Sequence, residues 1–250
     1  MVDKLVTCGD SFACGSGLDN VDAFEKSYAG LTANEIGVQQ KVLARPGCCN
    51  FIIWLQIKYA VHNINNPFVL ITMTNAARTT WYKSGVDKDE PKLEYLNYED
   101  YPPYDKRHKF SRPIPIDTDN TLQSETLQNL DTFFTEGAGA MWKQFDHEPT
   151  PRLRILKDWV AEFFDMQQKN QYDNSLMTMA HLLMNKNKIP HLFMGWQPEL
   201  GDLLPDVNYQ AIDWGHYSKQ YPDSKGTGHC DYTGHRLVHE EIINKVKAQL

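Results

Sequence analysis

The residues from Phe68 to Met73 form an almost unbroken apolar run that follows Pro67, and this run limits the possible folds most strongly. A short apolar run of this kind, bounded by turn-forming residues, indicates a strand that is buried inside a sheet. Strand and helix patterns alternate around it. The first third of the chain therefore predicts right-handed βαβ units and a parallel sheet.

The rest of the chain continues this alternation. Further strands are expected over residues 5–8, 40–44 and 189–195, and around 209–214. Helices are expected over residues 28–36, 51–62, 175–185 and 233–250. Asn50 can cap the second of these helices, because its side-chain oxygen can accept from a free main-chain N–H group. The sequence contains no internal repeat and no obvious linker, so residues 1–250 are predicted to form one α/β domain.

Residues 84–121 interrupt the alternation. They are rich in Pro, Asp, Lys and Tyr, with four tyrosines closely spaced between Tyr95 and Tyr104. We interpret them as a long insertion after the third strand, because long irregular segments of compact domains are usually functional or disordered. The tyrosines would suit a substrate lid, an aromatic face for a sugar or a protein, or a surface packed on the domain. Helical patterning returns over residues 124–145 and 151–168.

The charge balance argues against a nucleic-acid-binding protein. The formal net charge is -7, and no strongly basic run occurs. The N-terminal residues contain neither a signal-peptide core nor a membrane-spanning segment, so a cytoplasmic protein without a membrane span is expected.

The chain has five cysteines, an odd number, and a chain of this length needs no disulfide scaffold. We favour buried free thiols. Four of them, Cys8, Cys14, Cys48 and Cys230, flank the segments discussed next, so a group of thiols that alters activity on oxidation remains the alternative. The adjacent Cys48 and Cys49 have poor geometry for tetrahedral zinc.

The tripeptide Gly9-Asp10-Ser11 lies where the first predicted strand ends. Ligands of open α/β sheets bind at the carboxyl ends of the strands. A tight turn permitted by Gly9 can direct the Ser11 hydroxyl and its main-chain N–H at one point, which supplies a nucleophile and an oxyanion donor together. Gly-Asp-Ser is also a common turn sequence, so the tripeptide alone does not establish a function.

The segment from Gly228 to His235 places His229 in a loop before the last helix, five residues ahead of Gly234. Here the sequence resembles the SGNH (GDSL-type) hydrolase superfamily, in which a Gly-Asp-Ser turn follows the first strand and a histidine precedes a final Gly-His pair by this spacing. The resemblance implies a three-layer α/β/α sandwich with a mostly parallel, five-stranded, flavodoxin-like sheet. It also implies that Ser11 is the nucleophile and His229 the general base.

The family's two other blocks are matched by Gly47, after the second strand, and by Asn75, after the third. The resemblance implies that both donate to the oxyanion together with Ser11. It further implies an ester hydrolase acting on O-acetylated sugars, short-chain esters or lysophospholipids, with no metal or organic cofactor. SGNH-like proteins of bacteriophages are similar in lacking a secretion signal and carrying a long insertion, which makes the virion an alternative location.

The sequence departs from the family in two of the four blocks. The third block normally reads Gly-x-Asn-Asp, and here residues 73–76 read Met-Thr-Asn-Ala. Thr74 is therefore a candidate for substrate binding, together with Asp10 and with Arg78 as an anion-binding group. The family's aspartate three residues before the histidine is replaced by Gly226.

Without that aspartate, the group that orients His229 is open. Asp223 and Asp231 are the nearest carboxylates, and a main-chain carbonyl would leave a Ser–His dyad. His229, Asp231 and His235 could also be read as a metal cluster, but a structural role for His235 at the start of the last helix is favoured. The alternative function is a non-catalytic structural or binding protein of the same fold in a larger assembly, with contacts made by the Tyr/Pro-rich insertion.

Overall fold

The structure is a computed structural model that describes residues 2–18, 23–44, 48–74, 78–82, 130–134, 165–195, 207–224, 226 and 228–250. Its contacts divide the chain into two compact units. The first unit comprises Met1–Asn75 and Asn174–Leu250, and the second comprises Ala76–Asp173. The prediction of one domain with an insertion stays a prediction, and each unit is described by itself.

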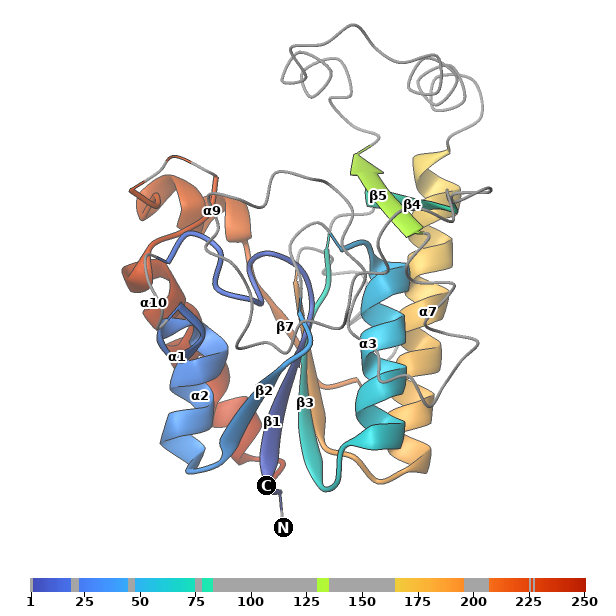
Figure 1. The fold of residues 1–250 in the computed structure, drawn as a ribbon, viewed down its shortest axis with the longest axis horizontal. Helices are drawn as coiled ribbons and strands as arrows, with labels where there is room; N and C mark the ends of the chain where they lie inside the picture. Colours follow the sequence, from blue (N-terminus) through green and yellow to red (C-terminus); the bar gives the residue numbers. More distant parts are fainter. Residues whose placement is uncertain are drawn as a thin grey trace, which may run out of the picture. The chain divides into compact units, whose positions relative to one another are not determined.

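The first unit is built on a five-stranded parallel sheet (Figure 1). Its strands, in sheet order, are β2 (Gln39–Val42), β1 (Lys4–Cys8), β3 (Pro67–Thr72), β6 (His191–Gly195) and β7 (Tyr209–Ala211). All four neighbouring pairs are parallel. Along the chain these strands follow the flavodoxin-like order 2-1-3-4-5, so the predicted architecture is confirmed.

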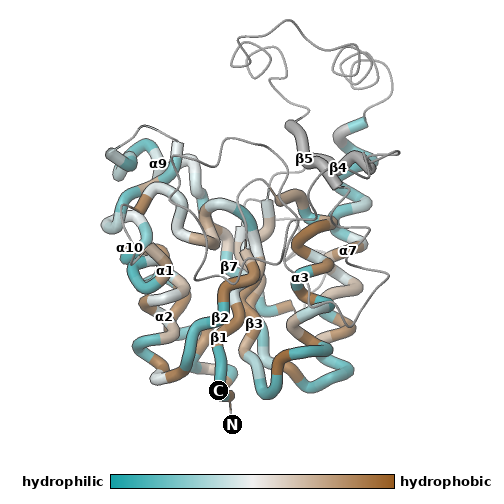
Figure 2. Tube along the Cα trace, in the orientation of Figure 1, coloured by the Kyte–Doolittle hydropathy of each residue, from teal (hydrophilic) through white to brown (hydrophobic). Residues whose placement is uncertain are grey.

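Helices cover both faces of this sheet, which makes three layers (Figure 1). One face carries α1 (Ala23–Lys26), α2 (Tyr28–Ile36) and α10 (Tyr232–Lys247), and the other carries α3 (Asn50–Asn63) and residues 174–186 of α7 (Met166–Lys186). The short helix α9 (Trp214–Gln220) follows β7. Every residue of the central strand β3 is buried, and Figure 2 shows the hydrophobic residues gathered along β1 and β3 between the helices.

Local hydrogen bonds fix where two of these helices begin. The Ser27 side chain accepts from the Gly30 N–H at the start of α2, and the Asp231 side chain accepts from the Gly234 N–H at the start of α10. The prediction that Asn50 caps α3 is wrong, because the N-cap residue is Cys49 and Asn50 is the first residue of the helix. The Asn50 carboxamide binds a neighbouring loop instead.

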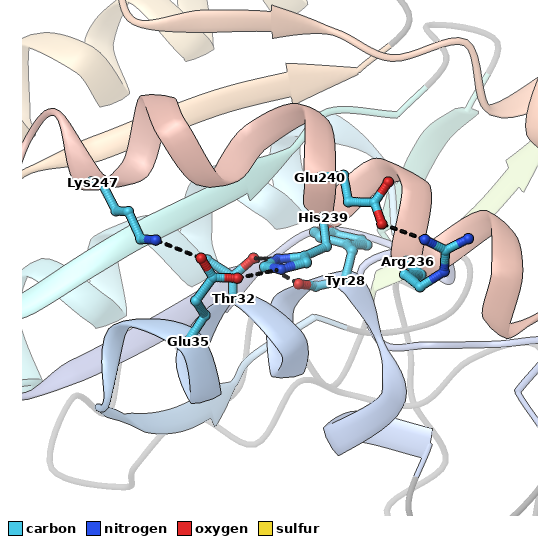
Figure 3. A network of polar contacts seen from close by, with 7 residues as sticks. All are labelled: Tyr28, Thr32, Glu35, Arg236, His239, Glu240 and Lys247. Atoms are coloured by element: carbon cyan, nitrogen blue, oxygen red, sulfur yellow. Dashed lines mark hydrogen bonds and ion pairs between the residues drawn. The ribbon is translucent and has the colours of Figure 1, made fainter.

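A polar network ties α10 to α2 (Figure 3). The His239 ring lies between the two helices, with Nδ1 3.0 Å from Thr32 Oγ1 and Nε2 2.9 Å from Glu35 Oε2. Lys247 binds the other oxygen of Glu35, and it is the main cause that lowers the pKa of that carboxyl. The two helices are thus held together by polar contacts as well as by packing, and α10 is the helix that follows the His229 loop.

In the second unit, β4 (Arg78–Tyr82) and β5 (Leu130–Phe134) form an antiparallel pair in which Tyr82 lies opposite Leu130. The helix predicted over residues 124–145 is therefore wrong at β5. The sequence Leu-Asp-Thr-Phe-Phe contains strand-favouring Thr and Phe residues, and its pairing with β4 prevails over helical periodicity.

The helix α7 is continuous from Met166 to Lys186, although the sequence predicted separate pieces that end near 168 and restart at 175. In the sequence, the Asn and Asp residues between these two pieces look like a break in the helix. An ion pair between Lys169 and Asp173, one helical turn apart, supports the helix there. Residues 84–121, the predicted insertion, lie outside the described residues. Among the described helices, none has the length and apolar character needed to cross a membrane.

Candidate active site

The Gly9-Asp10-Ser11 segment forms a tight turn at the carboxyl end of β1. Gly9 has φ +155°, and a Cβ at this position would lie 2.5 Å from the Cβ of Ala13. The Asp10 Oδ1 accepts from the Phe12 N–H at 3.0 Å, and the main chain then turns so that the Ser16 N–H donates to the Ser11 carbonyl at 2.9 Å. The turn is compact and leaves Ser11 4% exposed.

Asp10 and Thr74, two of the predicted substrate-binding residues, bind each other. The Thr74 hydroxyl donates to Asp10 Oδ2 at 2.8 Å, and both residues are buried. This bond joins the turn after β1 to the loop after β3. The pair therefore shapes the edge of the sheet where the serine lies.

The loop that carries His229 lies against the same turn. The His229 ring packs on the ring of Phe12, the residue after Ser11, with centroids 4.8 Å apart. A Cβ added to Gly17 would lie 2.7 Å from the Cβ of His229, so only glycine permits this approach at φ +97°. Segments more than 200 residues apart in sequence are thus brought together at the carboxyl end of β1.

Of the two aspartates considered for orienting His229, Asp223 is bound to it directly. The His229 N–H donates to Asp223 Oδ2 at 3.1 Å, and the Asp223 N–H donates to the His229 carbonyl at 3.0 Å. Asp223 is only 5% exposed. Asp231 instead caps α10 through its Oδ1. Gly226 has φ +64°, and a Cβ there would meet nothing within 4 Å.

Aromatic rings pack against the serine turn. The buried Trp214 stacks on Phe12, with centroids 4.7 Å apart, and lies beside Tyr28 at 5.5 Å. The ring of Tyr28 stacks on His235 in turn. Phe12 therefore contacts the rings of both Trp214 and His229.

His235 is a fully buried histidine that accepts from the Tyr28 N–H through Nδ1 at 3.3 Å. Burial is the main cause that lowers its pKa to about 3, with a smaller contribution from the charge of His229. It is therefore neutral at physiological pH, in keeping with the predicted structural role. No group of His, Cys, Asp and Glu side chains within the described ranges is arranged to hold a metal ion.

All five cysteines are buried thiols. Burial raises the pKa of Cys8, and it raises that of Cys230 to about 12. Thiols with such pKa values are poor nucleophiles. The Cys14 thiol donates to the Ser11 carbonyl at 3.3 Å, so it takes part in the packing of the turn.

Three predicted site residues cannot be placed at the site. Gly47 and Asn75, the expected oxyanion donors, lie outside the described residues. The main chain of Arg78 begins β4, but its side chain also lies outside them. Their assigned roles remain predictions.

The sequence did not predict that two buried carboxamides on α3 bind the loops at this site. Gln56 accepts from the Gly9 N–H, and Asn50 accepts from the Thr74 N–H. One signal was present in the sequence, because Gln56 lies between Leu55 and Ile57 in a strongly apolar helix. A polar residue inside such a helix is expected to have hydrogen-bond partners.

No protein-family model matches the chain, and no curated protein sequence matches it either. Three solved structures are similar over nearly the whole chain. A carbohydrate esterase with divergent catalytic and non-catalytic binding functions shares 10% identity over 98% of this chain, with a TM-score of 0.45. An acetyl xylan esterase from the rumen bacterium Butyrivibrio proteoclasticus shares 10% over 99%, with a TM-score of 0.47. A lipolytic protein of the G-D-S-L family from Desulfitobacterium hafniense shares 9% over 96%, with a TM-score of 0.43.

The chain spans 65% and 64% of the length of the two esterases and 98% of the lipolytic protein. The arrangement of the strands and helices is taken from the described residues alone. The strand order is flavodoxin-like, the serine turn follows the first strand, and the histidine loop precedes the last helix. The described part of the chain thus has the α/β/α fold that its resemblance to the SGNH hydrolases implies.

Proposed function

We propose that this protein is a serine ester hydrolase in which Ser11 is the nucleophile and His229 the general base. The contact between the His229 and Phe12 rings carries this proposal, because it brings a titratable base beside the residue that follows the serine. A serine hydroxyl is a weak nucleophile until an adjacent base removes its proton. An imidazole is the side chain best suited to do this near neutral pH.

The reaction would proceed in two halves. Ser11 Oγ attacks the ester carbonyl while its proton passes to His229, and the tetrahedral intermediate collapses when His229 returns the proton to the leaving alcohol. Water, deprotonated by His229, then attacks the acyl-serine and releases the acid and the free hydroxyl. The Ser11 N–H, the Gly47 N–H and the Asn75 amide are the proposed donors to the oxyanion.

Asp223 takes the place of the family's aspartate in this proposal. Its Oδ2 and its main-chain N–H both bind the main chain of His229, and its burial makes this contact rigid. It holds the loop so that the imidazole faces the serine turn. Asp231 has a different task, because its carboxylate caps α10.

The substrate class rests on the four sequence blocks. Their resemblance to the SGNH hydrolases favours small acyl groups, such as O-acetyl groups on sugars and short-chain esters. No step of the proposed reaction requires a metal ion or an organic cofactor.

A non-catalytic binding or structural role in a larger assembly is the second candidate. Two observations favour it: Gly226 replaces the usual aspartate, and Ser11 is only 4% exposed. A protein of this kind would keep the fold and lack turnover.

One experiment separates the two candidates. Wild type, Ser11→Ala and His229→Ala are treated with a fluorophosphonate probe and assayed on a panel of p-nitrophenyl esters and acetylated xylo-oligosaccharides. The hydrolase predicts labelling and turnover in wild type, with both lost in Ser11→Ala and reduced at least 10³-fold in His229→Ala. Labelling that is absent, or unchanged in Ser11→Ala, would instead favour the non-catalytic role.

A further inference from the structure

The helix α3 carries two fully buried carboxamides, Asn50 at its first position and Gln56 near its middle. Burying an amide is costly unless its donors and acceptors are paired. Both side chains meet this requirement by binding the main chain of loops at the candidate active site.

Gln56 binds both main-chain groups of Gly9. Its Oε1 accepts from the Gly9 N–H at 2.6 Å, and its Nε2 donates to the Gly9 carbonyl at 3.2 Å. The same Nε2 is 3.4 Å from Cys48 Sγ. One carboxamide therefore fixes the peptide planes on both sides of Gly9 and also contacts the segment that follows β2.

Asn50 holds Thr74 in the same two-sided way. The Thr74 N–H donates to Asn50 Oδ1 at 3.0 Å, and Asn50 Nδ2 donates to the Thr74 carbonyl at 2.9 Å. The Thr74 hydroxyl then reaches Asp10 at 2.8 Å. These contacts link α3 to both loops. Gln56 binds Gly9, the next residue Asp10 binds Thr74, and Thr74 binds Asn50 at the start of α3.

Each contact point lies next to a proposed oxyanion donor. Gly9 is two residues from Ser11, and Cys48 and Thr74 directly adjoin Gly47 and Asn75 in the sequence. The groups that α3 holds in place therefore belong to all three loops that would supply these donors.

We propose that Gln56 is a positioning residue which, together with Asn50, fixes the turn that carries Ser11 relative to the rigid body of α3. This inference rests on the proposed hydrolase function. The Ser11 hydroxyl and main-chain N–H act when they are held at the place where negative charge develops, so a shift of their turn weakens binding of the transition state more than binding of the ester. Loss of Gln56 should therefore lower kcat and leave KM nearly unchanged.

The test uses Gln56→Met in the full-length protein, a change that keeps the length of the side chain and removes its hydrogen bonds. We expect kcat for the ester hydrolysed best to fall roughly 10- to 100-fold, with KM within about twofold of wild type. The rate of Ser11 labelling by the fluorophosphonate probe should fall in parallel.

The matched control is Gln249→Met. Gln249 also bridges main-chain groups, since its Oε1 accepts from the His191 N–H at 3.2 Å and its Nε2 donates to the Lys245 carbonyl at 3.5 Å. It does so at the opposite, amino end of β6. The Tm of Gln249→Met should fall, while its kcat stays within about twofold of wild type. Both Gln56→Met and Gln249→Met are assayed well below their Tm.

Gln56→Leu provides a second variant if Gln56→Met does not fold. It also removes both hydrogen bonds to Gly9 and introduces no buried charge, so a loss of kcat similar to that of Gln56→Met is expected. Wild-type kcat in a folded Gln56 variant, or an equal loss in Gln249→Met, would overturn this inference while Ser11-dependent turnover persists. Wild-type turnover that does not depend on Ser11 would overturn the hydrolase function and this inference with it.

Discussion

An alanine at Gly9 would place its Cβ 2.5 Å from Ala13 Cβ and 3.0 Å from the Thr72 carbonyl, at φ +155°. Gly9→Ala should therefore combine backbone strain with overlap inside a packed core and cost about 3 kcal/mol of unfolding free energy. Gly37→Ala is the control, because Gly37 also has a positive φ but has open space around its Cα. Its cost should be about 1 kcal/mol. Urea unfolding measures both values, and equal losses would contradict this explanation of the turn.

The buried histidines make stability depend on pH. Burial is the main cause that lowers the pKa of His191 to about 4, and His235 is lowered to about 3. The unfolded chain, with histidine near 6.5, then binds more protons than the folded protein, so stability falls as the pH decreases below about 6.5 and levels off near 3 to 4. At roughly 1.4 kcal/mol per pKa unit, His191 alone accounts for about 3 kcal/mol.

Urea unfolding of wild type and His191→Gln between pH 7 and 4 tests this dependence. The variant should show a shallower decline than wild type, because it lacks the buried imidazole. Parallel curves for wild type and His191→Gln would exclude His191 as a cause.

Ser11 and His229 could be located from sequence because their positions relative to strand ends and to the last helix follow the chain order. Gln56 could not be assigned, since its partner Gly9 lies 47 residues away and the pairing arises only when α3 packs on the sheet. For the same reason, the sequence left Asp223 and Asp231 equivalent. Their hydrogen bonds to the His229 main chain and to the α10 N-terminus distinguish them.

At the level of secondary-structure elements, the two aspartates give opposite predictions. Asp231→Ala should lose about 1 kcal/mol of stability, because α10 loses its N-cap, while Asp231→Asn should keep both stability and kcat. Asp223→Ala should lower kcat at least tenfold, since it removes the acceptor of the His229 N–H and weakens the support of the His229 loop. Chemical denaturation and ester kinetics measure the two effects, and a loss of kcat in Asp231→Ala that matches that of Asp223→Ala would reverse the assignment.

The elements that the sequence predicted well are those buried in the parallel sheet or packed on it. The strand β3 and the helix α2 match their predicted ranges to within one residue, because apolar periodicity reflects burial directly. The strand β5 was missed because its partner β4 lies about 50 residues earlier in the chain. Cross-strand pairing of this kind leaves no periodic pattern in either segment alone.

On the scale of the whole molecule, none of the described strands of the parallel sheet comes from residues 76–173. Tyr82 and Leu130 are paired across β4 and β5, so a two-residue Asn-Gly turn can join them directly. A variant in which Asn-Gly replaces residues 83–129 should unfold with a free energy within about 0.5 kcal/mol of wild type. A larger loss of stability would show that the first unit depends on the replaced segment. Probe labelling of Ser11 in the same variant shows whether that segment is needed for reactivity.

The two hydrogen bonds between the Asn50 side chain and the Thr74 main chain affect how this sequence can change during evolution. The chain leaves the first unit after Asn75, one residue beyond these hydrogen bonds, and returns at Asn174. Thr74 is therefore held on both sides by Asn50, and its hydroxyl binds Asp10 in the serine turn. A substitution at Asn50 or Thr74 would alter the serine turn as well, so selection should allow these two positions to change only together.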